Sequence, residues 1–167
     1  MVMKRRRILL SGSNILYEAK NLVFDKDSNT EIFTGVYLFS ADNYLKDFEC
    51  RVIGIEGSPV NTGTLTLVSS RHPDNNVGFL IRPNGLSDHI YKGTISTPKT
   101  DQKANVIVRR INGVLSVTGD YITNQPVPFA PNAIYDKELV LGCALNSAGY
   151  AYRHASGTID HIIVRWI

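Results

Sequence analysis

The stretch NVIVRRINGVLSVT, residues 105–118, decides the fold class of this 167-residue chain. Two runs rich in Val and Ile flank the dipeptide Asn112-Gly113. A type I′ turn needs positive φ at both of its central residues, and Asn and Gly tolerate that conformation best. The stretch therefore predicts a β-hairpin in which Asn105–Ile111 pairs with Val114–Thr118.

Similar short runs recur between clusters of Gly, Asn, Pro and Asp, and helical periodicity is absent beyond about two turns. One helical turn is expected at Ala41–Lys46. The pattern predicts an all-β sandwich of two antiparallel sheets, with about 11 to 13 strands, because a βαβ fold needs crossover helices. Besides the hairpin, we expect strands at Arg7–Leu10, Ile15–Phe24, Val36–Phe39, Phe48–Ile55, Thr64–Ser69, Val77–Arg82, His89–Ile95, Glu138–Ala144 and Thr158–Trp166.

Alternation within residues 47–52 predicts which strand positions are buried. Phe48, Cys50 and Val52 alternate with Asp47, Glu49 and Arg51, as on a strand with one buried and one solvated face. The expected core positions are Phe48, Val52, Leu80, Val106, Val108, Leu139, Leu141, Ile162 and Val164. Two cysteines are too few for a disulfide framework, so we expect Cys50 and Cys143 to be buried free thiols.

The net charge of +3 comes from the first residues of the chain, where four basic residues occur without an acid. The 14 other basic residues and the 15 acidic ones nearly cancel. We therefore expect residues 1–13 to form a basic arm that docks on a partner, and residues 14–167 to form a single domain without a sequence-specific nucleic-acid surface. No apolar run suits a membrane span or a signal peptide. The docking residues of the arm would be Lys4, Arg5, Arg6 and Arg7.

Three parts of the chain resemble the concanavalin A-like lectin/glucanase jelly rolls of the laminin-G-like type. The first is NLVFD (21–25) with TGVYLFS (34–40) and KDFE (46–49), and the second is the hairpin at 105–118. The third is ELVLGCA (138–144) with GTIDHIIV (157–164). The resemblance implies a jelly-roll sandwich over roughly residues 20–166, but this fold serves lectins, hydrolases, adhesion modules and virion proteins alike.

The first half of the chain also resembles single-domain jelly-roll proteins of bacteriophage structural genes. That resemblance implies a non-enzymatic virion protein, such as a capsid decoration, head-fibre or tail-associated subunit. Its partners would be other virion proteins or further copies of itself in a homo-oligomer. It would be made in the host cytoplasm, lie at the virion surface and be able to contact host-surface glycans. A stand-alone carbohydrate-binding or adhesion module is the alternative, and a glycoside hydrolase is a remote third reading.

Glycoside hydrolysis needs two carboxylates about 5–10 Å apart. The nearest candidates, Asp47 and Glu49, lie at the entrance of a strand and are expected to be solvated, and Glu49 and Glu56 should face opposite ways. Ser87-Asp88-His89 does not make a catalytic triad, because adjacent residues on a strand point to opposite faces. We therefore expect no enzymatic activity.

Two loops offer oxygen atoms to a metal ion. Asp25, Asp27 and Asn29 alternate as calcium ligands do, but the loop lacks the Gly and Glu of an EF-hand. An ordinary polar loop is the main expectation. The alternative, implied by the jelly-roll resemblance, is a structural Ca²⁺ on a rim loop there or at residues 74–76. No zinc site follows from the spacing of the histidines, which stand at His72, His89, His154 and His161.

The loop that begins at Asn146 carries the residue types that bind sugars. Tyr150 and Tyr152 offer rings that could stack on a pyranose, and the other side chains could hydrogen-bond its hydroxyls. Tyrosines at such positions also cap cores or anchor protein interfaces, and these readings stay open. The expected hydrogen-bonding partners are Asn146, Arg153 and His154, with Arg71 and His72 from a neighbouring loop.

Overall fold

The computed structural model describes residues 14–57, 66–71, 78–81, 87–90, 93–96, 103–120, 127–128 and 134–167. The predicted strand Arg7–Leu10, the basic arm, His72 and residues 74–76 lie outside the described residues. Among those that are described there is no helix, and so none that is long and apolar enough to cross a membrane.

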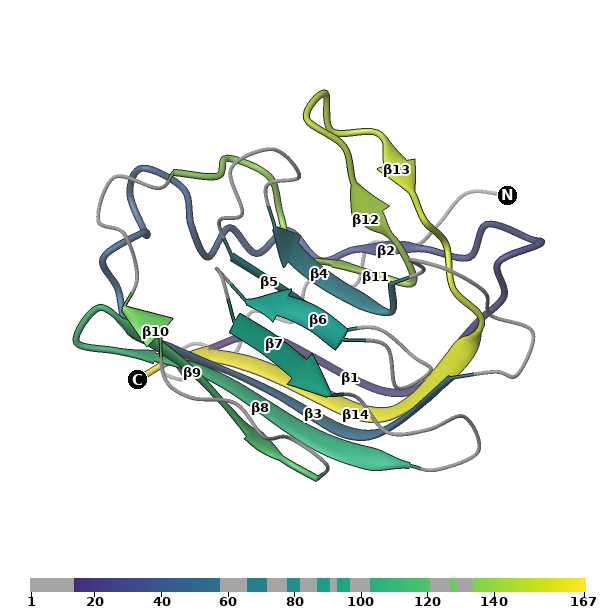
Figure 1. Ribbon diagram of the computed structural model, residues 1–167. Coiled ribbons are helices and arrows are strands. Elements are labelled where there is room, and N and C mark those ends of the chain that lie inside the picture. The colour runs from purple at the N-terminus through teal and green to yellow at the C-terminus, as the bar shows by residue number, and fades with distance from the viewer. Residues whose placement is uncertain are drawn as a thin grey trace.

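The described strands form two main antiparallel sheets and two small hairpins (Figure 1). The large sheet has the order β1-β14-β3-β8-β9-β10, and the small sheet has the order β2-β11-β4-β5. The hairpins pair β12 with β13 and β6 with β7. The strands are β1 (Ile15–Phe24), β2 (Ile32–Phe33), β3 (Phe48–Gly57), β4 (Val68–Arg71), β5 (Gly78–Ile81), β6 (Ser87–Ile90), β7 (Gly93–Ser96), β8 (Ala104–Ile111), β9 (Val114–Gly119), β10 (Val127–Pro128), β11 (Val140–Leu141), β12 (Ala144–Leu145), β13 (Ala151–Tyr152) and β14 (Gly157–Trp166).

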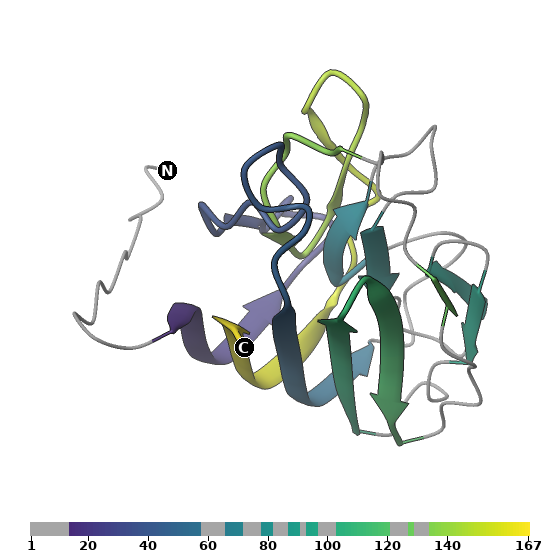
Figure 2. The ribbon, with the colours of Figure 1, turned by 90° about the vertical axis from the view of Figure 1, so that its left-hand side faces the viewer.

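The core lies between the two sheets. Turned by 90°, the molecule shows β1, β14, β3, β8 and β9 side by side (Figure 2). Alternate residues of β3 and β8 point inward from this sheet and meet apolar side chains of the small sheet. All nine predicted core residues are buried, with Leu80 outside the main cluster. Both cysteines are buried and free, as predicted.

Turns decide which of the predicted strands are observed and which are divided in two. Asn112 and Gly113 have φ of 51° and 75°, and β8 and β9 form the predicted hairpin around them. The prediction of one strand at Glu138–Ala144 is wrong, because Gly142 (φ 82°) interrupts the segment and directs it into two short strands. The expected strand His89–Ile95 is wrong too, since a hairpin of β6 and β7 occupies this stretch.

Val36–Phe39 was expected to be a strand, but it forms only one isolated bridge, from Phe39 to Tyr135. Residues 41–46 form hydrogen-bonded turns, and the Tyr44 N–H donates to the Ser40 carbonyl at 2.8 Å as in the single helical turn expected there. Strands β2, β10 and β13 were not expected, because each has two residues and so carries no alternation to detect.

The outermost strands of the described large sheet are irregular. β1 shifts register between Ile15 and Tyr17, and Asn21 within it has φ of 54°. At the other side, β10 contributes only the pairs of Val127 with Leu115 and of Pro128 with Val114.

A buried arginine fixes the turns that lead into β3. Arg110 follows Val106 and Val108 on the inward face of β8 and is 0% exposed. Its guanidinium donates hydrogen bonds to the backbone carbonyls of Tyr44, Asn43 and Lys46. Burial lowers the pKa of Arg110 to about 10, although Asp47 opposes the shift, so the group stays charged at neutral pH. One cation thus satisfies three carbonyls that would otherwise need water.

Paired irregularities accompany the bend of β3 and β14 (Figure 1). Gly54 has φ of 63°, and the register of β3 against β8 shifts between Val52 and Ile55. Asp160 of β14 occupies the space that a Cβ on Gly54 would need. Its carboxylate accepts a hydrogen bond from Lys103 Nζ at 2.7 Å. Only glycine therefore fits this point of the large sheet.

We predict that Gly54→Ala lowers the free energy of unfolding by about 3 kcal/mol or more, because it adds an overlap with Asp160 to an unfavourable φ. Gly113→Ala is the matched control, since Gly113 also has positive φ but no heavy atom lies within 4 Å of its Cβ position. The control should cost only about 1–2 kcal/mol. Urea unfolding of both variants measures the difference, and equal losses would contradict the role of Asp160.

Candidate functional site

The β12–β13 hairpin stands out from the sandwich in both views (Figures 1 and 2). Asn146 organises its turn. The Asn146 side-chain oxygen accepts a hydrogen bond from the Tyr150 N–H at 2.9 Å, and its backbone carbonyl accepts one from the Gly149 N–H at 2.9 Å. This side-chain oxygen, predicted to bind a ligand, is thus engaged in shaping the turn.

Aromatic and cationic groups meet along the hairpin. Tyr150 is 72% exposed, and Tyr152 is half-buried. The guanidinium of Arg153 lies 4.8 Å from the centroid of the Tyr152 ring, a cation–π distance. Arg153 has φ of 56°, so the chain turns sharply as it leaves β13. The structure therefore brings two of the predicted sugar-binding residues, Tyr152 and Arg153, into contact, and it leaves the nearby Tyr150 openly accessible.

The base of the hairpin is fixed to the sandwich. The Thr66 N–H donates to the Arg153 carbonyl at 3.0 Å, and the Ala155 N–H donates to the Gly142 carbonyl at 3.0 Å. A second apolar cluster fills the space beneath the hairpin. It consists of Val140, Cys143 and Leu145, with Phe33 and Ala151 packed against them. The exposed tip is thus carried by a rigid support.

The other predicted binding residues lie in different surroundings. Arg71 ends β4, the strand against which β12 packs, so the backbone brings it to the same region as the hairpin. His72 lies outside the described residues. The His154 ring is turned toward Glu31, and its Nε2 lies at a hydrogen-bond distance of 2.6 Å from the accepting Glu31 Oε2.

The loop proposed for calcium is a tight turn after β1. Asp25 accepts hydrogen bonds from the Asp27 N–H at 3.1 Å and from the Ser28 hydroxyl at 2.7 Å. The hydrogen bond from Ser28, with that from the Asp27 N–H, lowers the pKa of Asp25. Asn29 has φ of 49°. Both carboxylate oxygens of Asp25 therefore stabilise the turn itself, and calcium binding stays a prediction.

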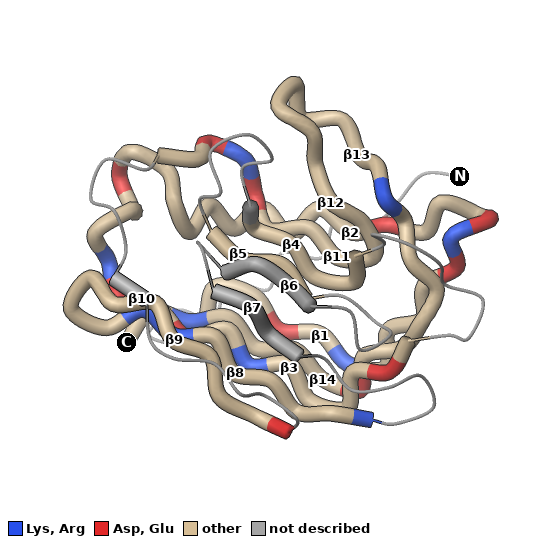
Figure 3. Tube along the Cα trace, in the orientation of Figure 1, with Lys and Arg blue, Asp and Glu red and all other residues tan. Residues whose placement is uncertain are grey.

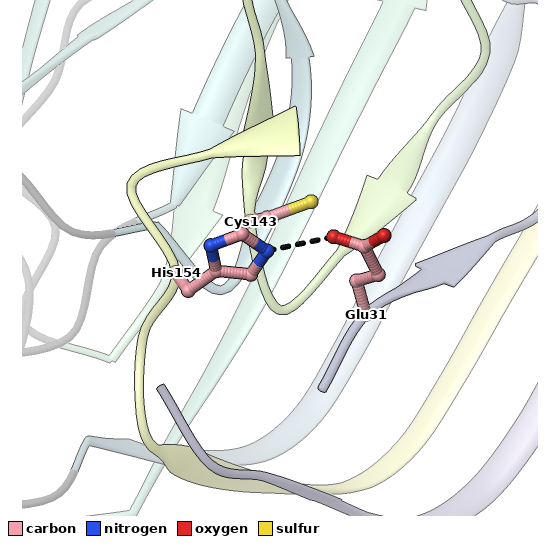
Figure 4. A group of neighbouring side chains, drawn as sticks. All are labelled: Glu31, Cys143 and His154. Atoms are coloured by element: carbon pink, nitrogen blue, oxygen red, sulfur yellow. Dashed lines mark hydrogen bonds and ion pairs between the residues drawn. The ribbon is translucent and has the colours of Figure 1, made fainter. Parts of the chain in front are cut away.

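Glu31, Cys143 and His154 converge beside the second apolar cluster (Figure 4). One potential ligand atom of each lies within 4.8 Å of the other two. Burial, with the nearby Glu31, raises the pKa of Cys143 to about 12. Sequence reasoning missed this group because its members lie far apart in the chain. Two-residue pairings of β2, β11, β12 and β13 and isolated contacts such as the Thr66–His154 bridge bring them together, and these carry little sequence signal.

A second charged cluster covers the outer face of the large sheet. Glu49 is 2% exposed, which corrects the expectation that this position is solvated. Arg109 contacts one of its carboxylate oxygens at 2.6 Å, and Arg165 contacts the other at 3.0 Å. Arg51 approaches the second oxygen to 3.4 Å. Basic segments accordingly lie on neighbouring strands of this sheet (Figure 3).

Solved structures show which class of fold this architecture belongs to. The CBM40 module of Ruminococcus gnavus IT-sialidase, bound to α2,3-sialyllactose, superposes with a TM-score of 0.52 at 13% identity over 92% of this chain and 92% of the module. At such identity the similarity shows the fold alone, a β-sandwich like that of this carbohydrate-binding module.

Two larger enzymes contain a similar domain. They are the NanB sialidase of Streptococcus pneumoniae (TM-score 0.58, 15% identity, 92% of this chain) and the leech intramolecular trans-sialidase (TM-score 0.55, 14% identity, 90% of this chain). The chain spans only 27% and 26% of their respective lengths. No protein-family model matches the sequence, and no curated protein matches it significantly.

The arginines around Glu49 make stability depend on pH. Burial alone would raise the pKa of Glu49, but the hydrogen bond and charge of Arg109, with Arg165 and Arg51, hold it below the ordinary 4.5. A carboxyl whose pKa is lowered by folding stabilises the protein above its unfolded-state pKa. That contribution disappears as the pH falls through the lower folded-state value.

We predict that Glu49→Gln lowers the free energy of unfolding at pH 7 by about 3 kcal/mol, because three arginines lose their shared anion. The difference from the wild type should shrink below the ordinary glutamate pKa of 4.5. Glu18→Gln is the control, since its pair with His161 is partly exposed and should contribute less than about 1 kcal/mol. Urea unfolding between pH 3 and pH 7 tests this, and a pH-independent difference would contradict it.

Proposed function

We propose that this chain is a non-enzymatic carbohydrate-binding domain that contacts its glycan through the β12–β13 hairpin. The observation that supports this most directly is the 72% exposure of Tyr150, which precedes by two residues the Tyr152 ring that contacts the Arg153 guanidinium. An exposed tyrosine ring offers a flat apolar surface to the C–H face of a sugar, and its hydroxyl offers a hydrogen bond. The rigid base of the hairpin limits the entropy lost on binding.

An acidic sugar fits the charge of this hairpin. The planar, cationic guanidinium of an arginine such as Arg153 matches a carboxylate in shape and charge. Its contact with Tyr152 already restricts the side chain before a ligand arrives. CBM40 modules of the same fold have been solved with α2,3- and α2,6-sialyllactose, whose sialic acid carries a carboxylate. We therefore infer that sialylated glycans are the first ligands to test.

The carboxylates considered for glycoside hydrolysis have other partners. Glu49 is enclosed by three arginines, and Asp47 accepts a hydrogen bond from the Asn112 N–H at 3.0 Å. These contacts favour binding over catalysis. The comparisons also support the carbohydrate-binding alternative better than the virion role. The virion role, with its homo-oligomer, its docking arm and its cytoplasmic synthesis, stays a prediction from resemblance.

We predict that the protein binds α2,3- or α2,6-sialyllactose more tightly than lactose in isothermal titration calorimetry. Tyr150→Ala should weaken binding of every sugar by about tenfold, the effect of losing roughly 1.4 kcal/mol of stacking. Arg153→Gln should remove the preference for the sialylated sugars and leave lactose binding unchanged. Tyr37→Ala is the control, because Tyr37 is also exposed but lies between β2 and β3.

The possible outcomes distinguish whether the protein binds glycans from where on its surface it binds them. If Tyr37→Ala weakens binding and Tyr150→Ala does not, the site lies away from the hairpin. If neither sialyllactose nor lactose binds, and a wider panel of acidic and neutral glycans also fails, the carbohydrate-binding proposal is overturned.

A further inference from the structure

Glu31, Cys143 and His154 are each held by backbone contacts of their neighbours. Glu31 directly precedes β2, whose residues pair with β11. Cys143 follows Gly142, whose N–H donates to the Leu67 carbonyl at 2.8 Å. His154 forms a parallel bridge with Thr66. Three distant segments of the chain thus present one side chain each to a common point (Figure 4).

The spacing of the three side chains is close to that of a metal site. His154 Nε2 and Glu31 Oε2 are 2.6 Å apart, and one potential ligand atom from each side chain lies within 4.8 Å of the others. In a tetrahedral zinc site with bonds of about 2.0–2.3 Å, ligand atoms stand roughly 3.3–3.7 Å apart. The histidine and glutamate therefore need to separate by about 1 Å, and a pair at the outer limit of 4.8 Å needs to close by a similar distance. Rotations about side-chain bonds change such distances by this amount.

The donor atoms distinguish between metals. A thiolate, an imidazole nitrogen and one carboxylate oxygen suit Zn²⁺, whereas Ca²⁺ and Mg²⁺ prefer oxygen ligands alone. Cys143 is 0% exposed, while the side chains of His154 and Glu31 are 17% and 21% exposed. The group is therefore closed on the thiol side and reachable by water on the other, where a fourth ligand would sit.

A nucleophilic role for this cysteine fits the surroundings less well. Burial, with the neighbouring Glu31, keeps the thiol protonated near neutral pH. The histidine ring nitrogen nearest the glutamate is already engaged in a hydrogen bond. A bound cation would instead favour the Cys143 thiolate, because a thiol that coordinates a metal ion loses its proton.

We propose that Glu31, Cys143 and His154 bind one Zn²⁺ ion, with water as the fourth ligand. On binding, the Cys143 thiol loses its proton to solvent as the Zn–S bond forms, and the hydrogen bond between His154 and Glu31 is replaced by two bonds to the metal. The ion would tie β2, the turn between β11 and β12, and the end of β13 into one unit. This proposal does not depend on glycan binding.

The test uses the full chain, stripped of metal with a chelator and then titrated with Zn²⁺ and, separately, with Co²⁺. We expect one Zn²⁺ per chain and a higher melting temperature. With Co²⁺ we expect a thiolate-to-metal charge-transfer band in the near ultraviolet, which reports the sulfur ligand without any mutation. Cys143→Ser should weaken zinc binding about 100-fold or more and should abolish the charge-transfer band. Glu31→Gln should weaken zinc binding about tenfold or more.

The chain provides its own control. His161 and Glu18 form the same kind of pair, with Nε2 and Oε1 2.8 Å apart, but His161 belongs to no group of three or more metal-ligating residues among those described. His161→Gln should leave zinc affinity and the cobalt band unchanged. Absence of a charge-transfer band in the wild-type protein, or zinc binding that is lost in His161→Gln and retained in Glu31→Gln, would overturn the proposal. Because the wild-type spectrum decides the outcome, instability of Cys143→Ser does not weaken the test.

Discussion

Burial of one face of β3, β8 and β14 is the constraint on which the rest of the structure depends. Their inward residues meet the small sheet and form a single apolar cluster. The same alternation directs Glu49 and its arginines outward, and it directs Arg110 inward, where backbone carbonyls receive its charge. A charged residue at an inward position costs free energy unless it is hydrogen-bonded. The Arg110 side chain at the end of β8 therefore depends on the carbonyls of the turns at residues 43–46, and these carbonyls depend on it.

The sequence predicts the parts of this fold that depend on local signals. Alternation identifies the long strands and the buried residues along them, and Asn112-Gly113 identifies the hairpin between β8 and β9. Contacts between distant segments are beyond such reasoning. Burial of Glu49 requires arginines from β8 and β14 as well as Arg51, and no spacing within one strand reveals them. The meeting of Glu31 with Cys143 and His154 depends on strands of two residues, which leave no periodic pattern.

The candidate site was predictable in composition but not in arrangement. Two tyrosines and an arginine within four residues indicated sugar binding, and the structure places Tyr150 at the surface. The sequence did not show that the Asn146 side chain is used within the turn, or that His154 faces Glu31. The hairpin therefore divides into an exposed tip, which is free to meet a ligand, and a base whose polar groups already have partners inside the protein.

The irregular outer strands of the large sheet affect how copies of the protein behave toward one another. A regular, exposed strand is a template for edge-to-edge pairing and aggregation. The register shift in β1 and the positive φ of Asn21 interrupt the row of backbone groups on one side. On the other side Pro128, which has no N–H, occupies half of the two-residue β10. Both outermost described strands therefore disfavour fibril-like stacking, so that a concentrated solution of the folded protein is protected from association through these strands.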